Sequence, residues 1–178
     1  MKKIITLFFL ITCITFAIPD FDNLRWGFSI DAIKGFYPDV KKEFTTSEGV
    51  TKFTTHPEDS NKKTITFYLF QNQLYKIIAE FDPSKVKSDD VSVIFNKYVE
   101  KFGTPTGNII NETYSDFAVR GNEHTWTVGS TYISFIGQDY FDKENRLNNS
   151  KLMMEYGLID PKNREKDSIL NDLILKDN

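Results

Sequence analysis

The clearest periodic pattern along the chain predicts an amphipathic helix over 88–102. Apolar residues recur there at intervals of three and four, which is the spacing of one helix face. They are Val91, Ile94, Phe95, Tyr98, Val99 and Phe102. Ser88 is the expected N-cap, Asp89 and Asp90 suit the positive first turn, and Gly103 suits a C-cap with positive φ.

Strands are predicted where apolar residues alternate. The runs 64–70 and 74–81 are joined by a short polar turn, which is typical of a β-hairpin. The runs 124–128 and 131–136 flank Gly129-Ser130, a pair that suits a type II′ hairpin turn. Further strands are expected over 50–55, 113–120 and 151–159, and the polar segment 137–150 is expected to be a loop.

A shorter helix is predicted over 29–37, because Ser29 can cap it and Pro38 ends it. Together these elements predict an α+β fold with two short-to-medium helices packed on an antiparallel β-sheet. Residues 25–83 and 84–159 share the order of a helix followed by strands. This order predicts an internal α-β-β-β duplication, and the alternative is two ordinary α+β stretches in one domain.

The N-terminal segment 1–17 has the pattern of a secretory signal peptide. Two lysines precede an uncharged apolar run, and small residues suit cleavage after Ala17. The run is too short for a transmembrane helix, which needs about 20 residues. We therefore expect a periplasmic or secreted protein, with a single domain over 18–160. The tail 161–178 is charged and contains a short apolar stripe, which is expected to dock on the domain or to bind a partner.

Cys13 raises the alternative of a lipid anchor, because Leu10-Ile11-Thr12-Cys13 loosely resembles a bacterial lipobox. Two features count against it. Thr12 is larger than the residue usual before such a cysteine, and the residues that follow Cys13 are still apolar. Cys13 is also the only cysteine of the chain, so an internal disulfide and a cysteine-rich zinc site are excluded.

Composition narrows the partner class. The 178 residues include 22 basic and 25 acidic side chains, for a net charge of −3, so no basic excess favours nucleic acid. Hydrophobic residues make up 40%, which excludes general disorder. Aromatic residues make up 15%, and this excess is the compositional feature that a function could use.

Candidate chemistry is sparse. His56 and His124 are far apart in the sequence, so neither a zinc site nor a catalytic triad is predicted. The acidic segment around Asp142 and Glu144 breaks the EF-hand pattern, so a solvated loop is the preferred interpretation. No cofactor or catalytic residue is assigned. Carboxylates that a sugar-active hydrolase could use as a pair are Glu80, Asp116, Glu123 and Glu155.

The predicted binding surface is an aromatic sheet face. Both sides of the hairpin at 64–81 are apolar, which predicts either burial on both faces or an exposed aromatic patch that binds a protein. The candidate binding residues are Tyr68, Phe70, Tyr75, Trp126 and Tyr132. The alternative is that these side chains serve the core.

Two turn motifs carry a family resemblance. Gly27-Phe28-Ser29 precedes the first predicted helix, and Phe102-Gly103-Thr104-Pro105 follows the second. They resemble the signatures of small bacterial envelope proteins of the BamE/SmpA type and of the tandem-repeat β-lactamase inhibitors. That resemblance implies two helices on an antiparallel sheet and the binding of another protein. We therefore predict an exported, non-enzymatic protein-binding module, with a carboxylate-based hydrolase or a carrier of small apolar ligands as alternatives.

Overall fold

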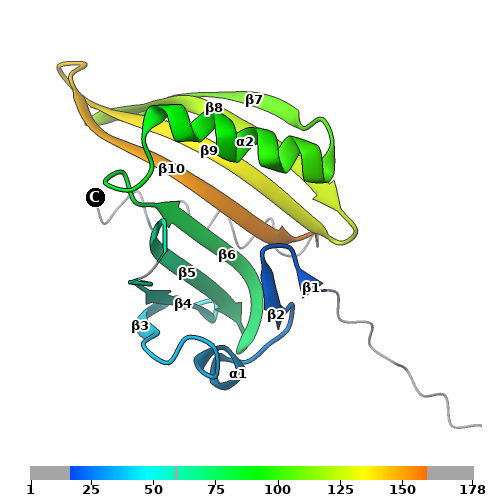
Figure 1. The fold of residues 1–178 in the computed structure, drawn as a ribbon. Helices are drawn as coiled ribbons and strands as arrows, with labels where there is room; N and C mark the ends of the chain where they lie inside the picture. The colour runs from blue at the N-terminus through cyan, green and yellow to red at the C-terminus, as the bar shows by residue number, and fades with distance from the viewer. Residues whose placement is uncertain (1–16, 59, 160–178) are drawn as a thin grey trace, which may run out of the picture.

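The computed structural model describes residues 17–58 and 60–159. Strands hold 56% of these residues and helices 14%, and eight strands form one antiparallel sheet (Figure 1). The strand order in this sheet is β3-β4-β5-β6-β10-β9-β8-β7. The helices are α1 (Ile30–Lys34) and α2 (Ser88–Phe102). The strands are β1 (Ala17–Ile18), β2 (Phe21–Arg25), β3 (Lys41–Thr45), β4 (Val50–Thr55), β5 (Lys62–Phe70), β6 (Gln73–Phe81), β7 (Thr106–Thr113), β8 (Phe117–Val128), β9 (Thr131–Asp142) and β10 (Leu147–Leu158).

The sheet consists of two halves with the same order of elements. Each half is a helix followed by a meander of four strands, and the last strands of the two halves, β6 and β10, pair antiparallel at the centre. Tyr156 lies opposite Ile77 and Met154 opposite Ala79 along this seam. The repeated unit has four strands where the sequence predicts three, and the duplication itself stays a prediction.

The expectation of an α+β fold with two helices packed on a sheet is wrong. The chain is mainly β, and among the described residues only α2 has seven residues or more. The helix predicted over 29–37 spans five residues, capped by Ser29 as expected. Beyond it the N–H groups of both Phe36 and Tyr37 bond to the carbonyl of Ile33, so the chain turns before Pro38.

The segment 137–150 is strand over most of its length, contrary to the prediction of a loop. It contains the end of β9 and the start of β10, and the exposed edge strand β7 was missed as well. In these parts the strands pair through their backbones, with one irregularity between Leu147 and Asn149, while the side chains of β7 and of the first four residues of β10 are mostly exposed. Strands can pair through their backbones there without alternating apolar residues. The pattern of apolar and polar residues therefore does not indicate a strand.

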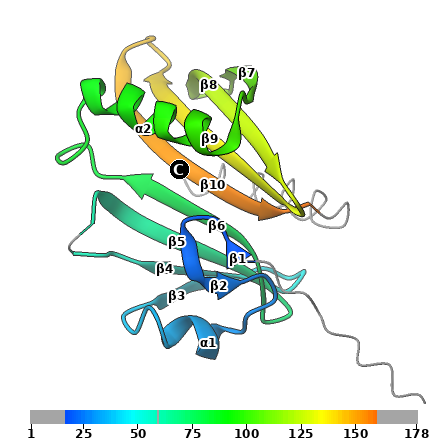
Figure 2. The same ribbon diagram turned by 45° about the vertical axis from the view of Figure 1, so that its right-hand side comes forward.

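The core lies between the sheet and the helices, on what we call the front face. Phe67, Ile77, Tyr156 and Ile133 follow one another across four neighbouring strands, and each is fully buried. Helix α1 contributes Ile33 to the same core. Helix α2 lies over β9 and β10 on this face (Figures 1 and 2).

Trp126 on β8 anchors helix α2. Its ring contacts those of Phe95, Tyr98 and Phe102, and its indole N–H donates to the Gly103 carbonyl at 2.7 Å. The helix begins as the sequence predicts, although Lys87 is the N-cap in place of Ser88. Yet no residue of α2 is fully buried, so its apolar stripe is only partly covered.

Two predicted segments fall outside the described residues. Of the signal peptide over 1–17 only Ala17 is described, and the tail 161–178 is not described at all. Ala17 and Ile18 form β1, and the Ile18 side chain just beyond the predicted cut is fully buried. Within the described part of the chain, no helix has the length and apolar character needed to cross a membrane.

Candidate functional site

The β1–β2 hairpin lies on the front face and brings Asp20 against α2 and β10. Asp20 is in the hairpin turn, where its φ of 64° is an unusual conformation for a residue other than glycine. Phe21, the next residue, packs edge-on against Tyr156 with ring centroids 5.2 Å apart. The turn therefore sits over β10, one of the two strands of the seam.

Asp20 accepts hydrogen bonds from three side chains of the C-terminal half. Tyr98 and Tyr156 donate to Oδ2 at 2.6 and 2.8 Å, and Lys101 donates to Oδ1 at 2.8 Å. Tyr98 and Lys101 belong to α2 and Tyr156 to β10. We call Asp20, Tyr98, Lys101 and Tyr156 the carboxylate clasp, because it ties the N-terminal hairpin to the helix and to the sheet.

Electrostatics makes the clasp a fixed charge rather than a proton donor. Burial alone would raise the pKa of Asp20, but the hydrogen bonds from Lys101, Tyr98 and Tyr156 outweigh it and hold that pKa below its ordinary value of 3.8. Burial and the bond to Asp20 raise the pKa of Tyr98, and burial raises that of Tyr156. At neutral pH one carboxylate is therefore held by two protonated tyrosines and an ammonium.

Replacing Asp20 by asparagine is expected to lower the free energy of unfolding by about 1–3 kcal/mol at pH 7, because hydrogen bonds to a charged acceptor are lost. The pKa of Asp20 in the folded state is below 3.8, the value for the unfolded chain. The carboxylate therefore stabilises the fold fully above the unfolded-state pKa. This stabilisation is lost as the pH falls through the folded-state pKa. The stability gap between the wild type and Asp20→Asn should therefore begin to close below about pH 4 and be lost once the pH is below the folded-state pKa of Asp20. Denaturant titrations at several pH values measure this.

Asp22→Asn is the matched control, since Asp22 lies two residues along the same hairpin with an exposed side chain. Its stability should follow that of the wild type at every pH. A stability gap for Asp20→Asn that stays constant down to pH 2 would contradict the role given to the carboxylate charge.

Lys62 lies beside the clasp and has an exceptional environment for a lysine. Its ammonium stands over the Phe21 ring, 4.7 Å from the centroid, and it forms no ion pair with any described residue. Burial lowers the pKa of Lys62, while the charge of Asp20 acts in the opposite direction. The site therefore holds a partly desolvated cation whose nearest favourable contact is an aromatic face.

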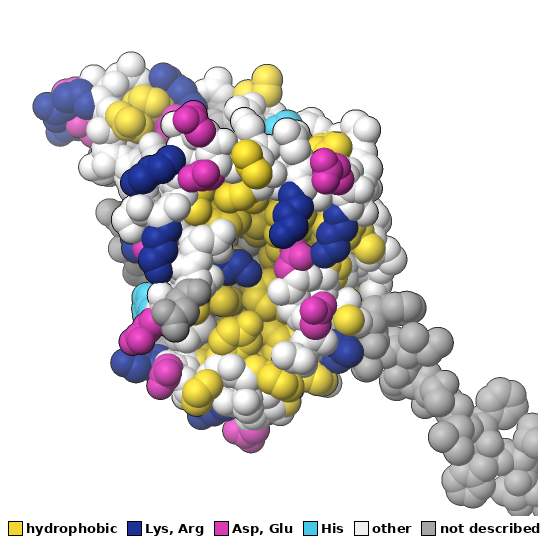
Figure 3. Space-filling model, viewed as in Figure 1, with side chains coloured by type: hydrophobic (Ala, Val, Ile, Leu, Met, Phe, Trp, Pro, Cys, Tyr) yellow, Lys and Arg dark blue, Asp and Glu magenta, His cyan; other side chains and the backbone are white. Residues whose placement is uncertain are grey.

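Apolar side chains surround these charges. Figure 3 shows a hollow below α2 in which hydrophobic side chains gather around a basic one. The part-buried stripe of α2 packs against the core on this face, as does Phe21. We call the stripe of α2 together with Asp20, Phe21 and Lys62 the front site.

The predicted aromatic residues do not share one surface. Tyr68 and Tyr132 lie in register with Lys76 and Gly157 on the opposite face of the sheet, the back face, whereas Trp126 points to the front core. Tyr68, Tyr75 and Trp126 are almost completely buried, and Phe70 and Tyr132 partly so. Trp126 is a packing residue under α2.

The back face also carries two of the predicted carboxylates. Glu155 accepts a hydrogen bond from Tyr132 at 2.6 Å and pairs with Lys76 at 3.0 Å, with both charged side chains largely buried. Glu80 pairs with Lys63 at 3.7 Å. These two acids are therefore held in ion pairs. Glu123 lies on β8, and Asp116 lies between β7 and β8.

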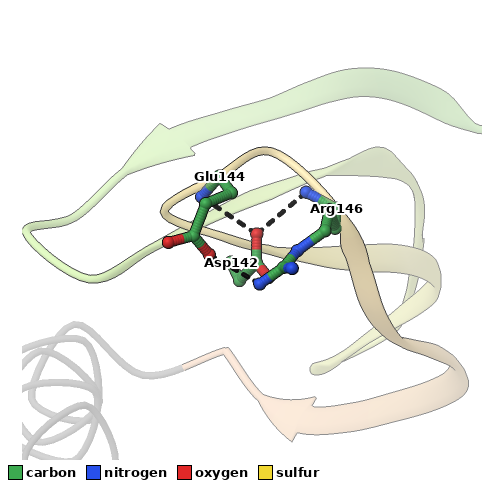
Figure 4. A network of polar contacts seen from close by, with 3 residues as sticks. All are labelled: Asp142, Glu144 and Arg146. Carbon is green, nitrogen blue, oxygen red and sulfur yellow. Dashed lines mark hydrogen bonds and ion pairs between the residues drawn. The ribbon is translucent and has the colours of Figure 1, made fainter.

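Hydrogen bonds and ion pairs organise the acidic segment at the β9–β10 turn. Asp142 Oδ1 accepts from the backbone N–H groups of Glu144 and Arg146, and the Arg146 guanidinium contacts both carboxylates (Figure 4). No group of three metal-ligating side chains occurs among the described residues. His56 donates through Nδ1 to the Lys63 carbonyl at 3.3 Å, and His124 packs on Phe95, so the two histidines are apart.

Sequence reasoning missed the front site because its members come from three distant segments. Asp20 and Tyr98 of α2 are 78 residues apart, and no motif links them. A comparison with known protein families, curated proteins and solved structures finds no match for this chain.

Proposed function

We propose that this chain is an exported protein-binding module without catalytic activity. Its front site receives an extended apolar segment of another protein, and that segment carries a carboxylate. The observation that carries the proposal is the incomplete burial of α2. A 15-residue amphipathic helix normally buries its apolar face against the core, and here every apolar residue of the α2 stripe is only partly buried.

The geometry favours a peptide segment as the occupant. The stripe of α2 supplies apolar surface, and partly buried side chains around a concave face are typical of grooves that bind amphipathic segments. The carboxylate clasp fixes one wall of this groove, since it joins the β1–β2 turn to α2. The polar groups of the clasp form hydrogen bonds with one another. This arrangement favours a rigid structural role over acid–base catalysis.

Charge complementarity defines the segment further. Lys62 is partly desolvated, and it forms no ion pair with any described residue. A carboxylate brought by the partner would therefore recover electrostatic energy in a site of low dielectric constant. An aspartate, a glutamate or a chain terminus flanked by apolar residues meets this requirement.

A random-peptide display library selected on the purified protein tests the proposal. The enriched peptides are expected to share one acidic residue between apolar ones. In fluorescence-anisotropy titrations of these peptides, Lys62→Met should weaken binding at least about tenfold, because it keeps the apolar stem and removes the charge. Lys62→Arg should restore most of the affinity.

Lys63→Met is the matched control, because Lys63 is the next residue on β5 and its ammonium pairs with Glu80 instead. It should leave peptide affinity unchanged. Thermal melts establish that Lys62→Met is folded, and we expect its stability to stay close to that of the wild type, since the ammonium is partly desolvated and forms no ion pair with a described residue. Enrichment of peptides without acidic residues, or equal affinity for both lysine variants, would overturn the proposal.

A further inference from the structure

The outer edge of β7 is an open strand edge. No described strand pairs with it, and seven of its eight residues are exposed. The Ile109 side chain is 79% exposed, the largest exposure among the large hydrophobic side chains of the described residues. Such an edge offers unpaired N–H and C=O groups to a further strand.

The opposite edge of the same sheet is protected. Strand β3 has five residues, of which three are charged: Lys41, Lys42 and Glu43. A bulge interrupts its pairing between Lys42 and Phe44. Charges and bulges are the means by which proteins block edge pairing. Strand β7 has neither a lysine nor a proline, its pairing with β8 is regular, and Glu112 is its only charge.

We propose that β7 pairs with β7 of a second copy of this chain, in an antiparallel arrangement that joins the two sheets edge to edge. A two-fold axis perpendicular to the sheet relates such strands, so residues on the same face lie opposite each other. With the axis at Ile109, this residue lies beside its own counterpart and covers it.

Charge and symmetry favour a second copy over a foreign strand. With the axis at Ile109, Glu112 lies opposite Thr106 of the other chain, and with the axis at Ile110 it lies opposite Asn108. Neither register brings like charges together. The contact uses the same edge of both chains, so it closes on itself, and the protected β3 edges prevent further growth. The expected assembly is therefore a dimer rather than a fibre.

Disulfide formation between single introduced cysteines tests the arrangement, in a Cys13→Ser background that leaves no other thiol. Ile109→Cys or Ile110→Cys should cross-link two chains rapidly, because residues facing each other at the axis have Cα atoms about 5 Å apart. Thr106→Cys should not, because its two copies would lie about 20 Å apart along the strands.

Sedimentation of the otherwise unaltered protein gives the second measurement. The wild type should be dimeric at micromolar concentrations, and Ile109→Lys should weaken association at least about tenfold by placing two like charges together. Val93→Lys is the control, since Val93 is 70% exposed on α2 and is not part of this strand edge. A monomeric wild type, a dimer that tolerates Ile109→Lys, or equal cross-linking at positions 106 and 109 would each overturn the proposal. None of these results bears on peptide binding at the front site.

Discussion

Replacing Trp126 by alanine is expected to lower the free energy of unfolding by about 3–5 kcal/mol, the range for truncation of a large buried aromatic side chain. Trp126 is only 3% exposed and contacts three aromatic rings of α2. The variant also leaves the Gly103 carbonyl without its indole donor at the point where the helix ends. Equilibrium unfolding in urea measures the loss.

The same variant should loosen α2 before the sheet. Because no residue of α2 is fully buried, its attachment depends on partial contacts, and Trp126 makes several of them. Hydrogen exchange should therefore accelerate in α2 more than in β9 and β10. Trp126→Phe keeps an aromatic ring in place, so it should lower the free energy of unfolding by less than Trp126→Ala does.

Trp26→Ala is the matched control for the helix. Trp26 is a partly buried tryptophan on the same face, and its indole N–H donates to Thr131 rather than to α2. Its loss should destabilise the protein without selectively exposing the amides of α2. Unchanged protection of α2 in Trp126→Ala would show that Trp126 does not anchor the helix.

The prediction of α2 succeeded because a period of 3.6 and a positive-φ glycine are local properties of the sequence. The hairpin between β5 and β6 and the turn at Gly129 succeeded for the same reason. Periodicity identifies which face of a helix is apolar, however, and not how much of that face the fold covers. The part-buried stripe of α2 could therefore not be predicted.

The strands that were missed lie where side chains on both faces meet solvent. In β7 and in the first residues of β10, pairing is determined by neighbouring backbone, and polar side chains such as those of Asn108 and Asn149 are tolerated. The polarity of 137–150 therefore predicts a loop, and β7 gives no strand signal over 106–112. The error in fold class has a second source as well, because the first predicted helix spans only the five residues of α1, while β7 adds a strand to the sheet.

The candidate site was beyond sequence reasoning for a different reason. Pro19 and Asp20 are the residues that end the apolar run of the predicted signal peptide, and nothing local indicates that Asp20 meets α2 and β10. The aromatic residues were identified, but alternation cannot say which face is covered. Trp126 and Tyr68 both lie on strands, yet on opposite faces of the sheet.

Replacing Gly121 by alanine is expected to lower the free energy of unfolding by about 3 kcal/mol or more, the upper range for overpacking in a well-packed interior. A Cβ atom at this position would overlap the Gly137 carbonyl oxygen and would lie 3.0 Å from the Gln138 Cα atom. Both neighbours are backbone of β9, so no side-chain rotation can relieve the overlap and the two strands must separate. Thermal and denaturant unfolding measure the effect.

Gly137→Ala is the matched control on the facing strand. A Cβ atom there meets only Leu152 Cδ1 at 4.0 Å, so the variant should be as stable as the wild type or slightly more stable, since alanine restricts the unfolded chain. The contrast has a second consequence, because Gly121 lies opposite Ile110 at the middle of β7. Separation of β8 from β9 at Gly121 should distort the open edge. Gly121→Ala should therefore weaken dimerisation, while Gly137→Ala should preserve it.

Equal stability of the two alanine variants would mean that the approach of β8 and β9 at Gly121 does not require a glycine.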